Sequence, residues 1–134
     1  FWYWFTDAGA AFGNREDLSA LGEECRLPFD LHFLRALIAP RPLLTLEGLD
    51  DTWANPFGTQ LSFLAAQPVY ELLGAGGHNA MRFREGGHEY NRQDWLAAVD
   101  FLDNTLCGKN VPADYHLYSP EDAAVWEAFQ SRMM

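Results

Sequence analysis

Two short apolar runs, each bounded by proline or glycine, constrain the fold of this chain more than any other feature. Residues 42–47 (PLLTLE) are almost continuously apolar, as in a strand that is buried on both faces of a parallel sheet. Residues 80–85 (AMRFRE) alternate as a second strand does. Helical patterns follow each run, and this strand–helix–strand–helix order predicts an α/β fold with parallel strands and flanking helices.

The expected helices have recognisable start and stop signals. Asp30 caps a first helix that ends at Ala39-Pro40, and residues 58–66 form a second. Pro68 starts a further short helix that Gly74 closes. Asn91 caps a helix that ends at Gly108 and carries one apolar stripe: Trp95, Leu96, Val99, Leu102 and Leu106. Residues 109–118 are expected to form a loop and Ser119 to begin a last helix, so we divide the chain into residues 1–108 and a helical extension, 109–134.

The two predicted strands each deliver a polar loop. Asp50 and Asp51 follow the first strand, and Gly86-Gly87 turns the chain so that His88 follows the second. Because ligands bind outside the carboxyl ends of strands in open α/β sheets, both loops fall where a site is expected. The 37 residues from Asp51 to His88 are enough for a helical crossover. A carboxylate that orients an imidazole is two-thirds of a hydrolytic triad.

The nucleophile of such a triad is missing from these residues. In α/β-hydrolases it precedes the acid and the histidine, in a Gly-x-Ser-x-Gly-like elbow. Ser19, Ser62 and Ser119 all lie in helical patterns without such an elbow. We therefore expect the C-terminal portion of an α/β-hydrolase three-layer sandwich, with the serine in an upstream segment. The five aromatic residues of 1–5 (FWYWF) fit an interior segment that packs against preceding structure.

Several assignments stay open at the level of sequence. Asp50 competes with Asp51 for the role of the acid. Trp53 either forms a wall of the pocket, where its ring would suit stacking on a sugar, or packs the loop. Glu89 adjoins His88 and is expected at the surface, and His32 fits a surface or packing histidine.

Charge and composition exclude several classes of protein. A formal net charge of −10 argues against binding to nucleic acid or to an anionic membrane surface. No apolar run approaches the roughly 18 residues of a membrane span, so we expect a soluble protein. Cys25 and Cys107 provide neither a disulfide framework nor metal-ligand spacing. We expect no metal and no cofactor.

Several spaced blocks occur in an order that resembles a known family. They are Leu27-Pro28-Phe29-Asp30-x-His32, Ala36-Leu37-Ile38-Ala39-Pro40-Arg41-Pro42, Asp51-x-Trp53-Ala54-x-Pro56, Ala65-Ala66-x-Pro68-Val69-Tyr70, and Arg84-x-Gly86-Gly87-His88 with Asp94-Trp95. Together they resemble the C-terminal part of the glucuronoyl esterases, carbohydrate esterase family fifteen. The resemblance covers about residues 1–107.

The resemblance implies a fold, a reaction and a location. The family has the α/β-hydrolase fold and cleaves esters between 4-O-methyl-glucuronic acid of xylan and lignin alcohols, with a serine nucleophile and no metal. It implies that His88 is the general base, that Trp53 lies near the sugar, and that Asp51 is the acid, although some members use an earlier glutamate. It also implies a secreted or periplasmic protein. Asn55 stands where many relatives carry an acid, a departure that bears on substrate contacts.

Other functions are compatible with the same residues. One is a different α/β-hydrolase, such as an esterase of non-uronate substrates, an acetyl xylan esterase or a peptidase. Another is an inactive remnant that acts as a carbohydrate-binding or interaction module, which the missing elbow keeps open.

Overall fold

The computed structural model describes residues 29–113 and 115–117 of the chain. The chain divides into two units, Phe1–Asp30 and Leu31–Met134, and nearly all described residues belong to the second. The predictions for residues 1–5, for Cys25 and for a helix that begins at Ser119 lie outside the described residues. The boundary at residue 108 therefore remains a prediction.

Three parallel strands form the described sheet in the order β1-β2-β3. β1 is Leu43–Gly48, β2 is Asn79–Arg84 and β3 is His116–Leu117. β1 and β2 are in register along their whole length, from Leu43 opposite Asn79 to Gly48 opposite Arg84, so they end at the same level. The two predicted strands are thus confirmed. The expectation of a loop through residues 109–118 is wrong for β3, which pairs with Met81 and Arg82 of β2.

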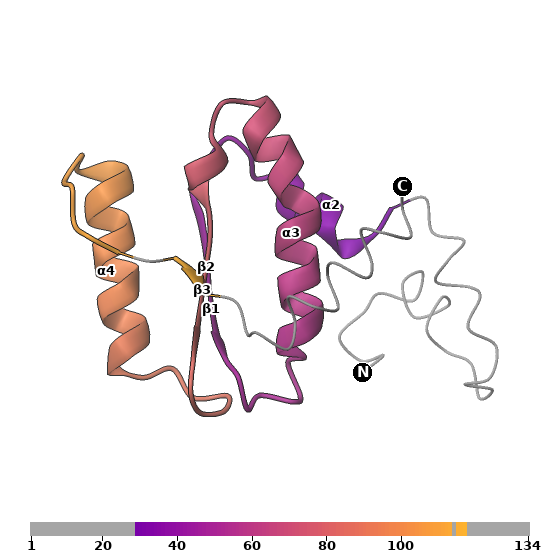
Figure 1. Ribbon diagram of the computed structural model, residues 1–134, viewed down its shortest axis with the longest axis vertical. Coiled ribbons are helices and arrows are strands. Elements are labelled where there is room, and N and C mark those ends of the chain that lie inside the picture. Colours follow the sequence, from indigo (N-terminus) through magenta and orange to yellow (C-terminus); the bar gives the residue numbers. More distant parts are fainter. Residues whose placement is uncertain (1–28, 114, 118–134) are drawn as a thin grey trace, which may run out of the picture. The chain divides into compact units, whose positions relative to one another are not determined.

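Helices cover both faces of this sheet. α2 is Leu31–Ala36, α3 is Pro56–Leu72 and α4 is Arg92–Leu106, and the short 3₁₀ helix η3 is Gly76–His78. Figure 1 shows the strands edge-on, with α3 on one side, α4 on the other and α2 beside α3. This arrangement of helix, sheet and helix confirms the predicted α/β class and its three layers.

α3 corrects one expectation. It runs unbroken from Pro56 to Leu72 with Pro68 inside it, where the sequence predicts two helices separated at that proline. Proline removes one helical hydrogen bond. However, Phe63, Ala66 and Tyr70 are buried on either side of Pro68, and their packing carries the helix through it. The helix ends at Leu72, and Gly74 closes it as predicted, in the left-handed region (φ 69°).

Burial is concentrated on β2 and α3. The core cluster consists of Phe63, Met81 and Phe83, with Leu64 packed against it. β1 was expected to be buried on both faces, but residues 43–47 are only half-buried and Gly48 alone is buried. β1 has one neighbouring strand, β2, within the described part of the chain, which leaves its other edge open.

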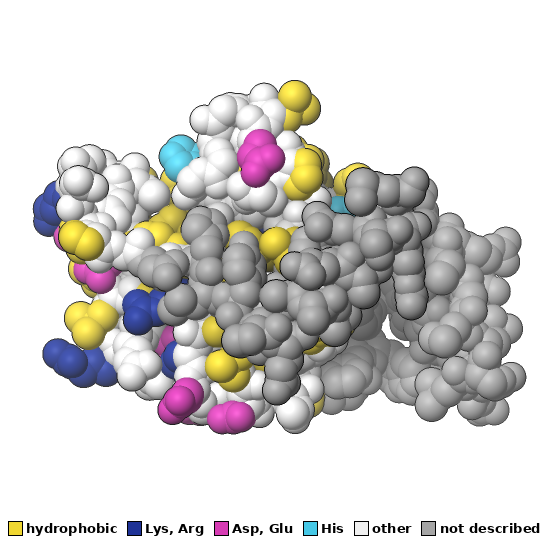
Figure 2. Space-filling view, viewed as in Figure 1, with side chains coloured by type: hydrophobic (Ala, Val, Ile, Leu, Met, Phe, Trp, Pro, Cys, Tyr) yellow, Lys and Arg dark blue, Asp and Glu magenta, His cyan; other side chains and the backbone are white. Residues whose placement is uncertain are grey.

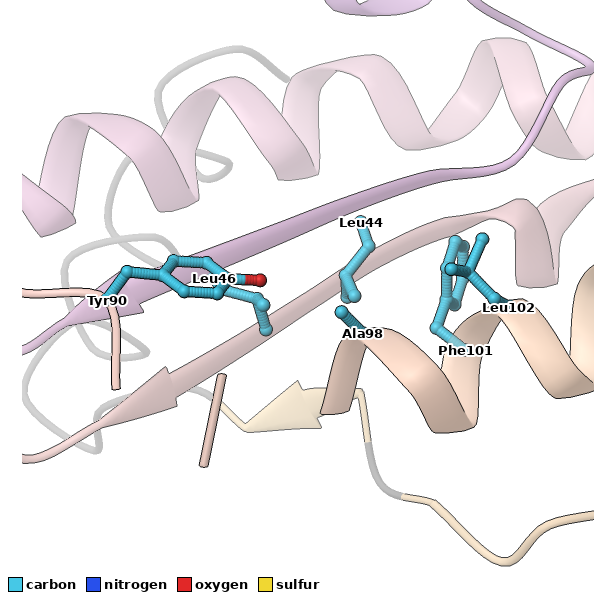
Figure 3. Close-up of a pocket in the computed structure, with 6 residues that line it drawn as sticks. All are labelled: Leu44, Leu46, Tyr90, Ala98, Phe101 and Leu102. Atoms are coloured by element: carbon cyan, nitrogen blue, oxygen red, sulfur yellow. The ribbon is translucent and has the colours of Figure 1, made fainter. Parts of the chain in front are cut away.

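α4 also packs less closely than its apolar stripe predicts. Its buried residues are Asp94, Ala97 and Phe101, whereas all five stripe residues are exposed. A hollow of about 340 Å³ lies between α4 and the sheet, and its lining consists of Leu44 and Leu46 of β1, Tyr90, and Ala98, Phe101 and Leu102 of α4 (Figure 3). The stripe is therefore not the surface that α4 buries in the described structure.

The surface carries charges of both signs. Figure 2 shows acidic and basic side chains distributed around the described part of this face, with hydrophobic side chains between them. Among the described residues, no helix is both long enough and apolar enough to cross a membrane.

Candidate functional site

The site lies at the carboxyl ends of β1 and β2. Asp51 comes three residues after β1 ends at Gly48, and His88 comes four residues after β2 ends at Arg84. Since those two strand ends are register partners, the loops that follow them emerge side by side. The parallel topology therefore brings the two residues together, as their sequence positions predict.

Asp51 and His88 are in direct contact. The Nδ1 atom of His88 lies 2.6 Å from Oδ2 of Asp51. The Asp51 side chain is 8% exposed, whereas that of His88 is 69% exposed. The other carboxylate oxygen of Asp51 accepts a hydrogen bond from the Ala54 backbone N–H at 3.2 Å. Both oxygens are thus held, and the carboxylate has one orientation toward the imidazole.

This contact determines which nitrogen of the imidazole carries the proton. The hydrogen bond from His88 is the largest cause of a lowered Asp51 pKa, followed by burial, which opposes it, and then by the Ala54 N–H. Asp51 is therefore ionised at neutral pH and accepts the Nδ1–H of His88. Nε2 of His88 has no hydrogen-bond partner among the described residues. It is left as a proton acceptor, as a general base requires.

Backbone hydrogen bonds tie the acid loop to the histidine loop. Leu49 N–H donates to Arg84 O at 2.8 Å, and Asp50 N–H donates to Gly86 O at 3.0 Å. The carboxylate of Asp50 accepts from Gly86 N–H at 3.1 Å and is not bonded to His88. Of the two candidate acids, Asp51 thus contacts the imidazole and Asp50 holds the loops together.

A glycine makes the close approach of these loops possible. A Cβ on Gly48 would overlap the carbonyl oxygens of Gly86 and Gly87. Gly86 itself has φ of 100°, a conformation that side chains rarely adopt. Both glycines are therefore part of the geometry that places His88.

Trp53 packs against the imidazole. Its ring centroid lies 5.0 Å from that of His88 with the planes perpendicular, and the side chain is 63% exposed. A hollow of about 160 Å³ opens beside the pair, and its lining includes Glu47, Asp51, Ala54, His88 and Tyr90. Trp53 thus has an exposed aromatic surface next to the imidazole.

Glu47 is a further carboxyl group near the pair. Burial is the main cause of its raised pKa, and the hydrogen bond with Thr59 opposes that shift. The charge of Asp51 raises the pKa further and that of His88 lowers it, which places Glu47 within electrostatic reach of both. In the sequence, this residue is recognisable only as the last position of a predicted strand.

A buried ion pair, not predicted from the sequence, lies next to the histidine loop. Nε of Arg84 lies 2.7 Å from Oδ2 of Asp94, and the two side chains are 7% and 5% exposed. Both residues belong to the blocks that resemble the glucuronoyl esterases, but no role was inferred for them. The available signal was an arginine near the end of the predicted strand, with an acid three residues after the Asn91 cap.

The other residues considered in the sequence are surface, packing or capping residues. Glu89 is exposed, and His32 lies on α2 with its ring 4.3 Å from that of Phe33. Cys107 is a free, exposed thiol. Asn55 caps α3, with its side chain accepting from Gly58 N–H at 3.1 Å. Within the described ranges, no group of three or more histidine, cysteine or acidic residues could hold a metal ion.

Comparisons with known proteins place this geometry in a family. Residues 3–74 match the family model described as glucuronyl esterase, fungi. The chain is 32% identical over 121 residues to "Carbohydrate esterase MZ0003" from an unknown prokaryotic organism, covering 79% of this chain and 26% of the relative. It is 38% identical over 109 residues to 4-O-methyl-glucuronoyl methylesterase 1 of Wolfiporia cocos, covering 76% of this chain and 26% of that protein.

A solved structure agrees with the sequence relatives. It is a carbohydrate esterase family 15 glucuronoyl esterase from Caldicellulosiruptor kristjansonii, with a TM-score of 0.61 and 37% identity over 71% of this chain and 26% of that one. The chain thus spans about a quarter of the length of the relatives it matches. The chain belongs to the glucuronoyl esterase family, and its described residues form part of an α/β-hydrolase fold.

Proposed function

We propose that the protein containing this chain is a serine-type carboxylic ester hydrolase that cleaves 4-O-methyl-glucuronoyl esters between xylan and lignin. The observation that carries the proposal is the contact between His88 Nδ1 and Asp51 Oδ2 at the ends of two parallel strands. It occurs in a chain whose relatives in Schizophyllum commune and Wolfiporia cocos are named 4-O-methyl-glucuronoyl methylesterases.

Each residue of the site has a defined part in the proposed reaction. A serine hydroxyl from an upstream segment attacks the ester carbonyl while Nε2 of His88 takes its proton. The imidazolium then protonates the departing lignin alcohol, which leaves a glucuronoyl–serine ester. Water, deprotonated by the same nitrogen, then attacks that ester, and the imidazolium returns the proton to the departing serine oxygen, which releases the uronic acid and restores the serine hydroxyl. Asp51 stabilises the imidazolium and holds its tautomer.

Trp53 is proposed to contact the sugar. Its exposed ring lies beside His88, where the uronate would be held during attack. An aromatic face suits the apolar face of a sugar ring, whereas the indole N–H can bond a hydroxyl. By the same family relationship, we propose that the protein is exported, since its substrate is a cell-wall polymer.

A serine-reactive probe and two esters test the proposal. The intact protein containing these residues is treated with a fluorophosphonate, and the labelled peptide is identified by mass. We expect one labelled serine upstream of Phe1, and turnover of a methyl glucuronate ester that far exceeds turnover of an acetyl ester. Preference for the acetyl ester would indicate another α/β-hydrolase esterase, and no label and no turnover would indicate an inactive binding module.

A further inference from the structure

The loop that carries His88 is held by one guanidinium group. Nη1 of Arg84 donates to Glu85 O at 3.0 Å, and Nη2 donates to Gly87 O at 3.2 Å. Nη2 also donates to the carbonyl oxygen of Glu89. These carbonyls lie on both sides of His88 in the chain, so one side chain fixes the backbone before and after the imidazole.

The guanidinium of Arg84 is itself held by a carboxylate on α4. Its Nε bonds Oδ2 of Asp94, and that same oxygen accepts from the backbone N–H of Asn91 at 2.8 Å. Asp94 thereby joins the first turn of α4 to the end of β2. Because both side chains of the pair are almost fully buried, the fork of donors has little freedom to swing.

The apolar contacts of this loop are made by exposed side chains, such as those of His88 with Trp53 and of Tyr90 with Trp95. The side chains of Glu85, His88, Glu89 and Tyr90 are all exposed. A loop with few buried contacts opens readily unless hydrogen bonds restrain it. Within the described structure, the bonds that restrain the backbone beyond Gly86 are those from Arg84 and the cap of α4.

We propose that Arg84 and Asp94 are positioning residues, which set the orientation of His88 through the loop backbone. This inference rests on the function proposed above for His88. A lysine at position 84 would keep the charge and lose the planar fork, and three carbonyls and a carboxylate cannot share one ammonium in the same geometry. The imidazole would then be displaced from its alignment with the nucleophile, and a misplacement of about 1 Å costs up to about a hundredfold in rate.

Arg84→Lys in the intact protein tests the proposal. We expect kcat to fall by about ten- to a hundredfold while KM for the glucuronate ester changes little. Arg82→Lys is the matched control, because Arg82 lies on the same strand two residues earlier and is outside the site. Glu89→Gln neutralises the exposed carboxylate partner of Arg84 without touching the backbone carbonyls, and kcat should fall less than in Arg84→Lys.

Nitrogen NMR of His88 gives a readout that does not depend on turnover. Wild type should show a single tautomer protonated at Nδ1, and Arg84→Lys should show a mixture, with Arg82→Lys unchanged. Asp94→Asn, which keeps an acceptor for the Asn91 N–H, serves if Arg84→Lys does not fold. Wild-type kcat and an unchanged tautomer in folded Arg84→Lys or Asp94→Asn would overturn the positioning role. If instead wild type has no esterase activity, the proposed function fails while the tautomer still decides the positioning role.

Discussion

Each end of the sheet holds one arginine in a hydrogen-bond network, but the two networks differ: Arg84 is buried and Arg35 is half-buried. At the carboxyl end, Arg84 bonds the carboxylate of Asp94 and the carbonyls of the histidine loop. Toward the amino end, Arg35 of α2 bonds Asn79 Oδ1 at 2.8 Å, Thr45 Oγ1 at 2.6 Å and Ala80 O, and stacks over the Phe63 ring.

The two arginines differ in the charge of their hydrogen-bond partners. Within the described part of the chain, Arg35 has only neutral partners, and burial lowers its pKa. Its network joins α2 to both strands. The other end combines buried charges with an exposed imidazole. A buried polar network therefore identifies a site only when it supports a reactive group that solvent or substrate can reach.

Removing the charge of Asp51 should have the largest effect. Asp51→Asn in the intact enzyme keeps the size of the side chain but offers an amide to Nδ1 of His88, which favours the wrong tautomer. By analogy with the serine protease triad, we expect kcat to fall by about 10⁴-fold. Asp50→Asn is the control and should stay within about tenfold, because Asp50 is bonded to Gly86 and not to the imidazole. Equal losses in the two variants would contradict the assignment of the acid.

Gly48→Ala should separate the loops. Its Cβ would overlap two backbone carbonyls of the histidine loop, which cannot move without displacing His88. We expect a loss of about 1–3 kcal/mol in the free energy of unfolding together with a drop in kcat. Gly77→Ala is a suitable control because a Cβ there meets nothing within 4 Å. Denaturant unfolding and steady-state kinetics measure both quantities, and unchanged kcat in Gly48→Ala would argue against coupling of the loops.

Arg35→Leu should affect stability without affecting chemistry. The substitution leaves Thr45 Oγ1 and the buried Asn79 Oδ1 and Ala80 O without this donor, and a buried unsatisfied group costs about 1–3 kcal/mol. We expect the unfolding midpoint to fall, with kcat of the folded fraction near wild type. A loss of kcat in a fully folded Arg35→Leu variant would show that this end of the sheet also contributes to catalysis, and would contradict the proposed difference between the two ends.

The smallest expected effect is on the free energy of unfolding at low pH, compared between wild type and Asp51→Asn. Because the pKa of Asp51 is lowered from 3.8 in the fold, its ionised form stabilises the native state. That contribution is fully present above its ordinary pKa and is lost as the pH falls through the lowered value. The stability difference between wild type and Asp51→Asn should therefore shrink below pH 3.8. A difference that is constant with pH would show that the contact does not shift the pKa.

The sequence predicts those parts of the fold that have a local pattern. The alternation of residues 80–85 and the Asn91 cap locate β2 and α4, and parallel topology then places Asp51 beside His88. β3 has only two residues, too few to show a pattern. The continuity of α3 through Pro68 depends on tertiary burial, which outweighs the local cost of proline.

The supporting part of the site is harder to predict for a related reason. The bonds of Arg84 go to carbonyl oxygens, which every residue has, so residue identity does not reveal them. Asp94 could be recognised as a capping acid, but its second contact depends on how the loop returns to the sheet. Side chains with distinctive chemistry, His88 and Asp51, are visible in the sequence, whereas side chains that hold backbone are not.

The central claim is that His88 is the general base of a glucuronoyl ester hydrolase, and its substitution tests that claim most directly. The intact protein and its His88→Ala variant are compared on a methyl glucuronate ester, with circular dichroism to show that both are folded. We predict that wild type hydrolyses the ester and that His88→Ala loses at least about 10⁴-fold in kcat. Near-normal turnover by a folded His88→Ala variant would contradict the claim.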